Sequence, residues 1–369
     1  MSKVSVVLGC GFGDEGKGKT VDWLCEKYAH DNPLVVRFSG GQQCGHTVMN
    51  HMGKHVHSSF PAGTLRGCDG FIMKHCTVSP IHMFNEWEVL KKIQPNFQLS
   101  VDPLAMVTTP YDIAYNKIAA KIKGHGSCGM GVGSTMERNF QSPYKLYVID
   151  LMNDWILDQK LEQIKRYYVQ KIKNLEGANH NHRNGMEIFT RNYFKQFKTT
   201  LSWFRLNTNV EPFEFPSDRR VIFEGSQGIL LDMDHGIFPH VTYANTTCKN
   251  IAEYTLGCET YYVTRAYSTR HGGGPLKDED ANFQIKNTEH EINVDNEFQG
   301  SLRYAPLDIR LLEYAMDVNE LYLKTSDKNN IFLTVNGLDQ IGNPPNFKFI
   351  FRHPIIKIYK SNTPKTFYE

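Results

Sequence analysis

Short runs of apolar and β-branched residues, each closed by glycine or polar residues, recur along the chain and predict buried strands. These runs cover residues 4–8, 33–38, 220–224, 261–266 and 331–335. Apolar residues at helical spacing predict helices at residues 20–28, 86–93, 112–122 and 154–175. The chain therefore begins with a strand, a glycine loop, a helix and a second strand, an order that is typical of α/β folds.

These elements predict an α/β fold with a central, mostly parallel sheet, helices on both faces, and a P-loop-like phosphate loop after the first strand. We expect one domain over residues 1–369, with a helical insertion around residues 80–200. A polar stretch bounded by glycines, residues 177–185, predicts an exposed loop. His180 and His182 in that stretch could bind a metal ion, but we expect a solvated loop tip.

The composition limits the classes of function. The 369 residues are 40% apolar, enough for a large core, and the net charge is +2. A chain so nearly balanced has no global basic surface, so we expect no nucleic-acid partner and only a local site for polyanions. The eight cysteines form no CxxC pair and zinc-ligand spacing is absent, so we expect reduced thiols and no structural zinc site. No leader sequence and no apolar run of about 18 residues is visible, which predicts a cytoplasmic protein without a membrane partner.

The glycine loop after the first strand, residues 9–20, reads GCGFGDEGKGKT and fits two phosphate-binding patterns. Its glycines match GxGxxG, and its end matches GxxxxGK[ST] with Lys19 and Thr20. Both patterns direct backbone N–H groups of a strand-to-helix turn at a phosphate. The dinucleotide pattern lacks its acidic residue at the end of the second strand. The P-loop pattern places Asp14 and Glu15 beside the phosphates, which requires a cation or a proton-transfer role.

Five segments in order resemble the adenylosuccinate synthetase family and together extend over roughly residues 4–340. They are GDEGKGK at 13–19, GGQQCGHTV at 40–48, FEGSQGILLDMDHGIFP at 223–239, VTYANTT at 241–247 and AYSTRHGGGP at 266–275. The resemblance implies a ligase that uses a nucleoside triphosphate to activate the 6-oxo group of a purine nucleotide. The amine of aspartate then replaces that group.

The chemistry and the resemblance together suggest roles for individual residues. Asp14 is the expected base for the N1 proton of the purine, which makes O6 nucleophilic. The resemblance implies that Asp14 and the carbonyl of Gly45 hold Mg²⁺, that His46 is a general acid, and that Gln227 orients the base. For His46, and more so for His235, the alternative is a hydrogen-bonded structural histidine. Asp232 and Asp234 could simply brace a loop.

The remaining expected contacts fall into three groups. The triphosphate group comprises Gly13, Glu15, Gly16, Lys17, Gly18, Gly45, Thr47 and Asn336. The monophosphate group comprises Gln43, Gly126, Ser127, Cys128, Arg138, Gln227, Thr242 and His271. The aspartate group comprises Ser301, Leu302 and Arg303. By analogy with the family we also expect a homodimer, with Arg138 as the nearest candidate for an arginine lent across the interface.

Three departures from the family bear on the substrates. The aspartate loop, here residues 296–308, keeps only Arg303 of a run of arginines. The segment that reads guanine of GTP is here LTVNGLD at 333–339 and lacks the lysine and spacing, so we infer ATP or dATP as donor unless Asp339 serves instead. In the monophosphate loop, Met130 and Ser134 replace an arginine and a proline.

A shortened chain with these departures resembles the bacteriophage branch, which joins aspartate to dGMP with ATP. The product would be 2-amino-2′-deoxy-N6-succinyladenylate, a precursor of diaminopurine DNA, and the location would be the host cytoplasm. The first alternative is an ordinary synthetase that uses IMP and GTP. A different class of function, a P-loop nucleotide-binding switch or regulator, predicts ATP hydrolysis or binding without ligation.

Overall fold

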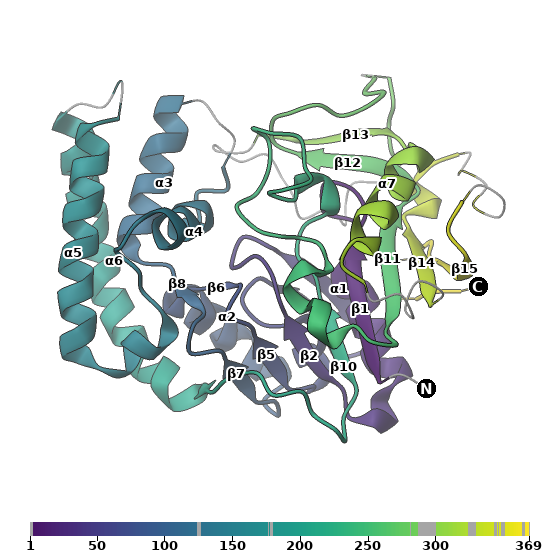
Figure 1. Ribbon diagram of the computed structural model, residues 1–369, viewed down its shortest axis with the longest axis horizontal. Helices are drawn as coiled ribbons and strands as arrows, with labels where there is room; N and C mark the ends of the chain where they lie inside the picture. Colours follow the sequence, from purple (N-terminus) through teal and green to yellow (C-terminus); the bar gives the residue numbers. More distant parts are fainter. Residues whose placement is uncertain are drawn as a thin grey trace.

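A computed structural model describes residues 3–123, 127–175, 177, 180–280, 282–286, 300–323, 330–342, 345, 347, 351–363 and 366–368. Its centre is a nine-stranded sheet with the order β15-β14-β11-β1-β10-β2-β5-β7-β9 (Figure 1). Every neighbouring pair in this sheet is parallel. The strands are β1 (Val4–Gly9), β2 (Leu34–Arg37), β5 (Gly70–Ile72), β7 (Leu99–Val101), β9 (Asn209–Val210), β10 (Val221–Glu224), β11 (Glu259–Arg265), β14 (Ile331–Asn336) and β15 (Ile355–Lys360). The predicted fold class is confirmed.

Three short strand pairs accompany the central sheet. β3 (His46–Asn50) and β4 (Gly53–His57) form an antiparallel hairpin directly after β2. β12 (Tyr267–His271) and β13 (Leu302–Pro306) form a second antiparallel pair, which begins where β11 ends. β6 (Thr77–Val78) pairs with β8 (Met106–Val107) in parallel. The hairpin and the β12–β13 pair thus extend the chain beyond the carboxyl ends of the central strands.

The central strands are buried on both faces, because successive side chains of a strand point to opposite sides. In β1, Val7 belongs to one core cluster, while Val6 and Leu8 belong to another. α1 (Lys17–Lys27) packs on the first face through Val21 and Leu24, and α7 (Ile309–Glu320) packs on the second. The run of apolar residues that predicted β1 therefore reflects two covered faces.

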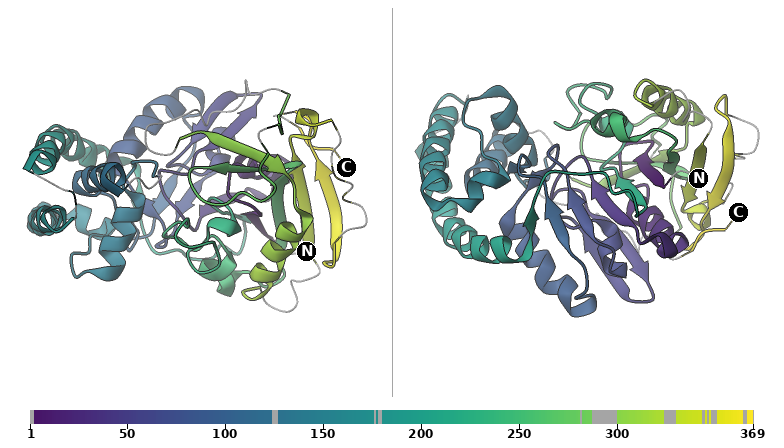
Figure 2. Two further views of the ribbon diagram at one scale, coloured as in Figure 1. Left: turned by 90° about the horizontal axis from the view of Figure 1, so that it is seen from above. Right: turned by 60° about the horizontal axis from the view of Figure 1, so that its bottom comes forward.

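The other helices are α2 (Pro80–Ile93), α3 (Pro110–Lys123), α4 (Val132–Gln141), α5 (Asp154–Lys173) and α6 (His180–Asn207). In every view of Figures 1 and 2, α3, α5 and α6 lie at one end of the long axis, beyond strand β7. These helices lie in the chain between β6 and β9, where we expected the helical insertion, and the division into domains stays a prediction. No helix in the described ranges is both long and apolar enough to cross a membrane.

The expected loop at residues 177–185 is wrong, because α6 already begins at His180. Apolar positions continue along this helix from the buried Met186, and α6 packs against α3. That packing outweighs the cost of about 1 kcal/mol for a glycine such as Gly185 inside a helix. α2 begins at Pro80 instead of residue 86, with the proline in the first turn, where its missing N–H is harmless.

Candidate active site

A cavity of about 220 Å³ opens beside the carboxyl ends of the central strands. The loops after β1, β2 and β10 contribute most of its wall, as expected for a ligand site of an α/β sheet. Thirteen of the predicted site residues line it: Gly13, Asp14, Glu15, Gly16, Lys17, Gly18, Gln43, Gly45, His46, Thr47, Cys128, Gln227 and His271. Phe12, Cys44, Leu231 and Arg265 also line the cavity but were not predicted.

The glycine loop is held in shape by one of its own carboxylates. Glu15 accepts hydrogen bonds from the N–H groups of Gly11 (2.7 Å) and Gly13 (3.0 Å), and it pairs with Lys17 Nζ at 3.0 Å. The Glu15 side chain is only 5% exposed, so its charge is compensated inside the loop. The phosphate-binding patterns predicted that these two N–H groups contact a ligand. In the structure they are bound to Glu15 instead.

The backbone N–H groups that remain available for a phosphate lie at the start of α1. Gly16 precedes this helix with a φ of 98°, and no side chain caps the first-turn N–H groups. A Cβ at Gly16 would come within 2.7 Å of Asn336 Nδ2, which itself donates to the carbonyl of Glu15. The open helix N-terminus faces the cavity with the positive end of its dipole, the usual setting for a phosphate.

Lys19 does not point at the cavity, although the P-loop pattern required it there. Its Nζ donates to Ser361 Oγ and to the carbonyl of Thr363, and lies 4.3 Å from the ring centroid of Phe367. Burial lowers the pKa of Lys19 to about 7. Lys17, two residues earlier, lines the cavity instead. The loop therefore differs from a P-loop, in which the lysine at the position of Lys19 contacts the phosphate.

Asp14 lies on the cavity wall with a left-handed backbone (φ 61°). Its carbonyl oxygen accepts a hydrogen bond from Arg265 Nε, but its carboxylate has no partner among the described residues. Gly45 lies on the same wall. A carboxylate without a partner suits an ion that prefers oxygen ligands, and a main-chain carbonyl that lines the same cavity is a second ligand of that kind, so these residues fit Mg²⁺.

His46 is bound to a buried carboxylate that sequence reasoning missed. Its Nδ1 donates to Glu224 Oε1, and the other oxygen of Glu224 accepts from the N–H of Ala62 at 2.9 Å. Burial lowers the pKa of His46. Burial alone would raise the pKa of Glu224, but the charges of His46 and Arg37 outweigh it and hold that pKa below its usual value. The sequence did contain a signal for this carboxylate, because Glu224 is the acidic residue of the FEGSQG segment.

Three amide side chains near the cavity keep a buried oxygen without a hydrogen-bond partner in the described part of the chain. They belong to Gln43, Gln227 and Asn336. Buried polar atoms in folded proteins are almost always hydrogen-bonded, so each exception needs an explanation. Gln43 and Gln227 line the cavity, and a ligand with N–H donors would satisfy them.

Arg138 is not brought to the cavity. It is fully buried, with Nε and Nη2 on the carboxylate of Asp112 at 2.9 and 3.1 Å, and with further bonds to two carbonyl groups. The hydroxyl of Tyr168 also donates to Asp112. Arg138 therefore stabilises the packing of α3, α4 and α5. Its side chain has no exposed surface that could contact another subunit. The expectation that Arg138 reaches across an interface therefore has no support in this geometry.

The residues expected to bind aspartate lie on or beside β13, outside the cavity wall. Arg303 pairs with Glu279 at 2.6 Å and donates to the carbonyls of Gly272 and Gly274. Ser301 is exposed and Leu302 is the register partner of His271. An aspartate carboxylate would have to replace Glu279 to reach this arginine.

The remaining predicted residues are placed as follows. Neither Thr242 nor Ser127 lines the cavity. Thr242 donates its N–H to the carbonyl of Leu231, and Ser127 donates its hydroxyl to Asn116. Gly126 lies outside the described residues. Asp232 accepts from the N–H groups of Asp234 and Thr246, and His235 contacts the hydroxyl of Tyr322 at 2.7 Å, which are structural roles.

Comparisons with known proteins agree with the motifs. The profile of the family described as adenylosuccinate synthetase matches residues 6–335. The adenylosuccinate synthetase of Clostridium beijerinckii is 30% identical over 364 residues, which cover 93% of this chain and 81% of that protein. The enzyme of Bordetella pertussis is 31% identical over 296 residues, which cover 76% of this chain and 65% of that protein.

Two solved structures share the fold. The fully ligated adenylosuccinate synthetase of Plasmodium falciparum superposes with a TM-score of 0.66 at 20% identity, over 92% of this chain and 77% of that one. The succinoaminodeoxyadenylate synthetase PurZ of cyanophage S-2L, bound to dGMP and dATP as an energy donor, superposes with a TM-score of 0.60. Its identity is 15%, over 98% of this chain and 93% of that one.

Proposed function

The chain belongs to the adenylosuccinate synthetase family, carbon–nitrogen ligases that join aspartate to a purine nucleotide, and we propose that its own substrates are dGMP, L-aspartate and ATP. The product would be 2-amino-2′-deoxy-N6-succinyladenylate. The alternative within the family is IMP with GTP, as the names of the cellular relatives suggest.

The observation that carries this proposal is the pair of unpartnered amide oxygens of Gln43 and Gln227 in the cavity. The 2-amino group of dGMP carries two N–H donors, whereas the base of IMP has no donor besides the N1–H, which goes to Asp14. Leaving a buried acceptor unpaired costs about 1–3 kcal/mol. A site with two such acceptors therefore favours the guanine base over hypoxanthine.

The choice of ATP rests on the end of β14. The family reads guanine of GTP with a carboxylate in this region, whereas here the buried Asn336 lies under the glycine loop and bonds to the carbonyl of Glu15. Asp339 is exposed, bonds to Gln340, and does not line the cavity. The phage neighbour with the same fold was solved with dGMP and dATP, which supports an adenine donor.

We assign the steps to residues on the cavity wall. Asp14 takes the N1 proton, so that O6 bonds to the γ-phosphorus of the donor while the bond to the β–γ bridging oxygen breaks and the nucleoside diphosphate leaves. Lys17 and the N-terminus of α1 hold the phosphates. His46, held by Glu224, donates a proton to the phosphate as charge develops there. The aspartate amine then attacks C6 and phosphate leaves. Mg²⁺, bound by Asp14 and the carbonyl of Gly45, would supply neutralisation of phosphate charge.

Arg303 remains our candidate for the carboxylate of aspartate. In this role it exchanges Glu279 for the substrate, while the carbonyls of Gly272 and Gly274 keep its guanidinium in place. The predicted homodimer stays part of the proposal, on analogy with the family.

The test is a matrix of turnover assays on the purified protein with Mg²⁺ and aspartate. Each of dGMP and IMP is combined with each of ATP, dATP and GTP, and the succinylated product is separated by chromatography. We expect product from dGMP with ATP or dATP. Turnover of IMP with GTP, and none of dGMP with ATP, would replace the proposal with the ordinary synthetase. Phosphate release without aspartate or a monophosphate would instead indicate a nucleotide switch.

A further inference from the structure

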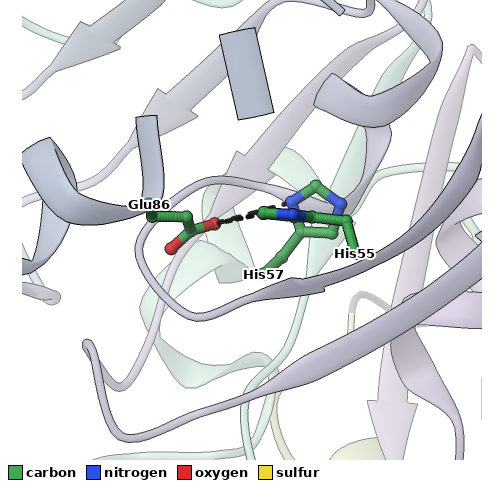
Figure 3. A group of neighbouring side chains, drawn as sticks. All are labelled: His55, His57 and Glu86. Atoms are coloured by element: carbon green, nitrogen blue, oxygen red, sulfur yellow. Dashed lines mark hydrogen bonds and ion pairs between the residues drawn. The ribbon is translucent and has the colours of Figure 1, made fainter. Parts of the chain in front are cut away.

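A second group of ionisable side chains lies between the β3–β4 hairpin and α2. His55 and His57 alternate along β4, so their rings leave the same face of the strand, and Glu86 of α2 faces them (Figure 3). All three are buried, at 7%, 0% and 8% exposure. In the described part of the chain, this is the one group of three or more His, Cys, Asp or Glu whose ligand atoms lie within 4.8 Å of one another.

The two distances from Glu86 Oε1 to the imidazoles are close to the edges of a tetrahedral metal coordination shell. Glu86 Oε1 lies 3.4 Å from His55 Nε2 and 3.7 Å from His57 Nδ1. Thr64 Oγ1 lies 3.4 Å from the same His57 nitrogen. A tetrahedral Zn²⁺ with bonds of about 2.0–2.1 Å holds its ligand atoms about 3.3–3.4 Å apart. Two histidines and one glutamate are moreover a recurrent zinc ligand set, with a water or another oxygen in the fourth position.

Ordinary hydrogen bonding accounts poorly for the same atoms. The contacts that converge on Glu86 Oε1 are longer than the usual 2.7–3.2 Å for N–H···O. His57 Nδ1 has only the contacts of 3.7 Å to Glu86 Oε1 and 3.4 Å to Thr64 Oγ1, so it lacks a hydrogen bond of ordinary length. An ion held between these atoms would account for their spacing.

The carboxylate of Glu86 is fixed in its orientation by the backbone, as metal-binding carboxylates usually are. Its second oxygen accepts from the N–H groups of Ser58 (3.0 Å) and Ser59 (2.6 Å) and from the hydroxyl of Ser58 (2.9 Å). Oε1 is directed at the two imidazoles and, apart from them, has only a long contact of 3.4 Å from the N–H of Phe60. The group is thus preorganised from both sides, by the strand for the histidines and by the 58–59 backbone for the glutamate.

We propose that His55 Nε2, His57 Nδ1 and Glu86 Oε1 bind one transition-metal dication of the Zn²⁺ class, with Thr64 Oγ1 or a water as the fourth ligand. The site is structural and separate from the Mg²⁺ site of the reaction, and it does not depend on which nucleotides the protein uses. His57 on β4 is paired in register with His46 on β3. A metal ion that joins β4 to α2 therefore also holds in place the strand next to His46. Metal binding should therefore stabilise the hairpin that supplies His46 to the cavity.

The test uses the full chain, with any affinity tag removed, dialysed against chelator and returned to a buffer with excess Mg²⁺. Zn²⁺ or Co²⁺ is added, unbound metal is removed, and bound metal per chain is measured by mass spectrometry. We expect one bound ion per chain, a visible Co²⁺ spectrum typical of four-coordinate N and O ligands, and a Tm that rises with free Zn²⁺ because only the folded chain has the site. A wild-type protein that retains no Zn²⁺ would overturn the proposal.

His55→Gln and His57→Gln remove one ligand each, and His51→Gln is the matched control, since His51 is an exposed histidine in the turn of the same hairpin. We expect both ligand variants to lose the bound ion and the Zn²⁺-dependent rise in Tm, while the control keeps both. Retention of one ion by both ligand variants would place the metal elsewhere. Should either variant fail to fold, the wild-type Co²⁺ spectrum still decides, because thiolate charge-transfer bands would assign the ion to cysteines and refute the site.

Discussion

Replacing Glu224 by glutamine tests whether the buried carboxylate behind His46 contributes to the reaction. The change keeps the size of the side chain and removes its charge. Glu224 accepts from His46 Nδ1 with one oxygen and from the Ala62 N–H with the other. Glutamine has a single acceptor oxygen, so one of these two donors loses its partner.

The expected size of the effect follows from the burial of this pair. A buried hydrogen bond to a charged group contributes about 1.5–3 kcal/mol, which corresponds to roughly 10- to 150-fold in rate. We therefore expect kcat of Glu224→Gln to fall by roughly that factor with little change in KM. The free energy of unfolding should also fall by about 1–3 kcal/mol if the Ala62 N–H is left unpaired.

The pH profile separates a role in catalysis from a structural one. Glu224 stabilises the protonated form of His46, and burial opposes that form. Removing the carboxylate lowers the pKa of His46 further, so the proton that His46 must donate is lost at lower pH. The high-pH limb of the kcat profile should move to lower pH in Glu224→Gln.

The assay is steady-state turnover with saturating substrates from about pH 5.5 to 9, which brackets the ordinary imidazole pKa. Glu259→Gln is the matched control, because Glu259 is a partly buried carboxylate at the opposite end of the strands, paired with Tyr28 and Arg220. It should lose stability but keep the wild-type profile. A Glu224→Gln enzyme with wild-type kcat and an unmoved profile would refute the reasoning.

Three further predictions concern single residues. Asp14→Ala should lower kcat by about 10²–10⁴-fold while calorimetry still shows dGMP binding, and a near-normal rate would remove Asp14 from the mechanism. Lys19 has a pKa of about 7 in the folded protein against 10.5 in the unfolded chain, so the folded state loses this proton first. Stability should then rise with pH between about 7 and 10.5, and Lys19→Met should show a flatter dependence of Tm on pH; equal slopes would contradict the burial argument. Arg138→Met leaves Asp112 charged and without its cation in the interior, so urea unfolding should show a loss of about 3–5 kcal/mol. Activity per folded molecule should survive, and a selective loss of dimer with unchanged stability would restore the interface role.

Part of the site could be predicted because each of its motifs is a short segment that directly follows a predicted strand. The loop at residues 9–20 and the segment at 40–48 follow β1 and β2, two neighbours of the same β10 strand in a parallel sheet. The carboxyl ends of such strands meet at one edge, so Asp14, His46 and Gln227 could be expected to share a cavity. The same argument fails for side chains that turn away from that edge, as Lys19 does.

The short strands show the limit of pattern reading. β5, β7 and β9 have two or three residues each, too few for a period of two to be visible. They exist because the neighbouring strand already offers hydrogen bonds along its edge. Likewise, no pattern in residues 180–185 predicts a helix. α6 begins there because the helix packs on α3.

By itself, the sequence determined the α/β fold, the family and the local chemistry of the phosphate loop, because these depend on residues near one another in the chain. Only the tertiary structure decided which side chain each charge meets. It brought Glu224 to His46, Asp112 to Arg138, and Glu86 to two histidines about thirty residues earlier, where ligand spacing in the sequence predicted no metal site. Partners far apart in sequence are chosen by packing, and burial then fixes the charge, the pKa and the chemistry of each group.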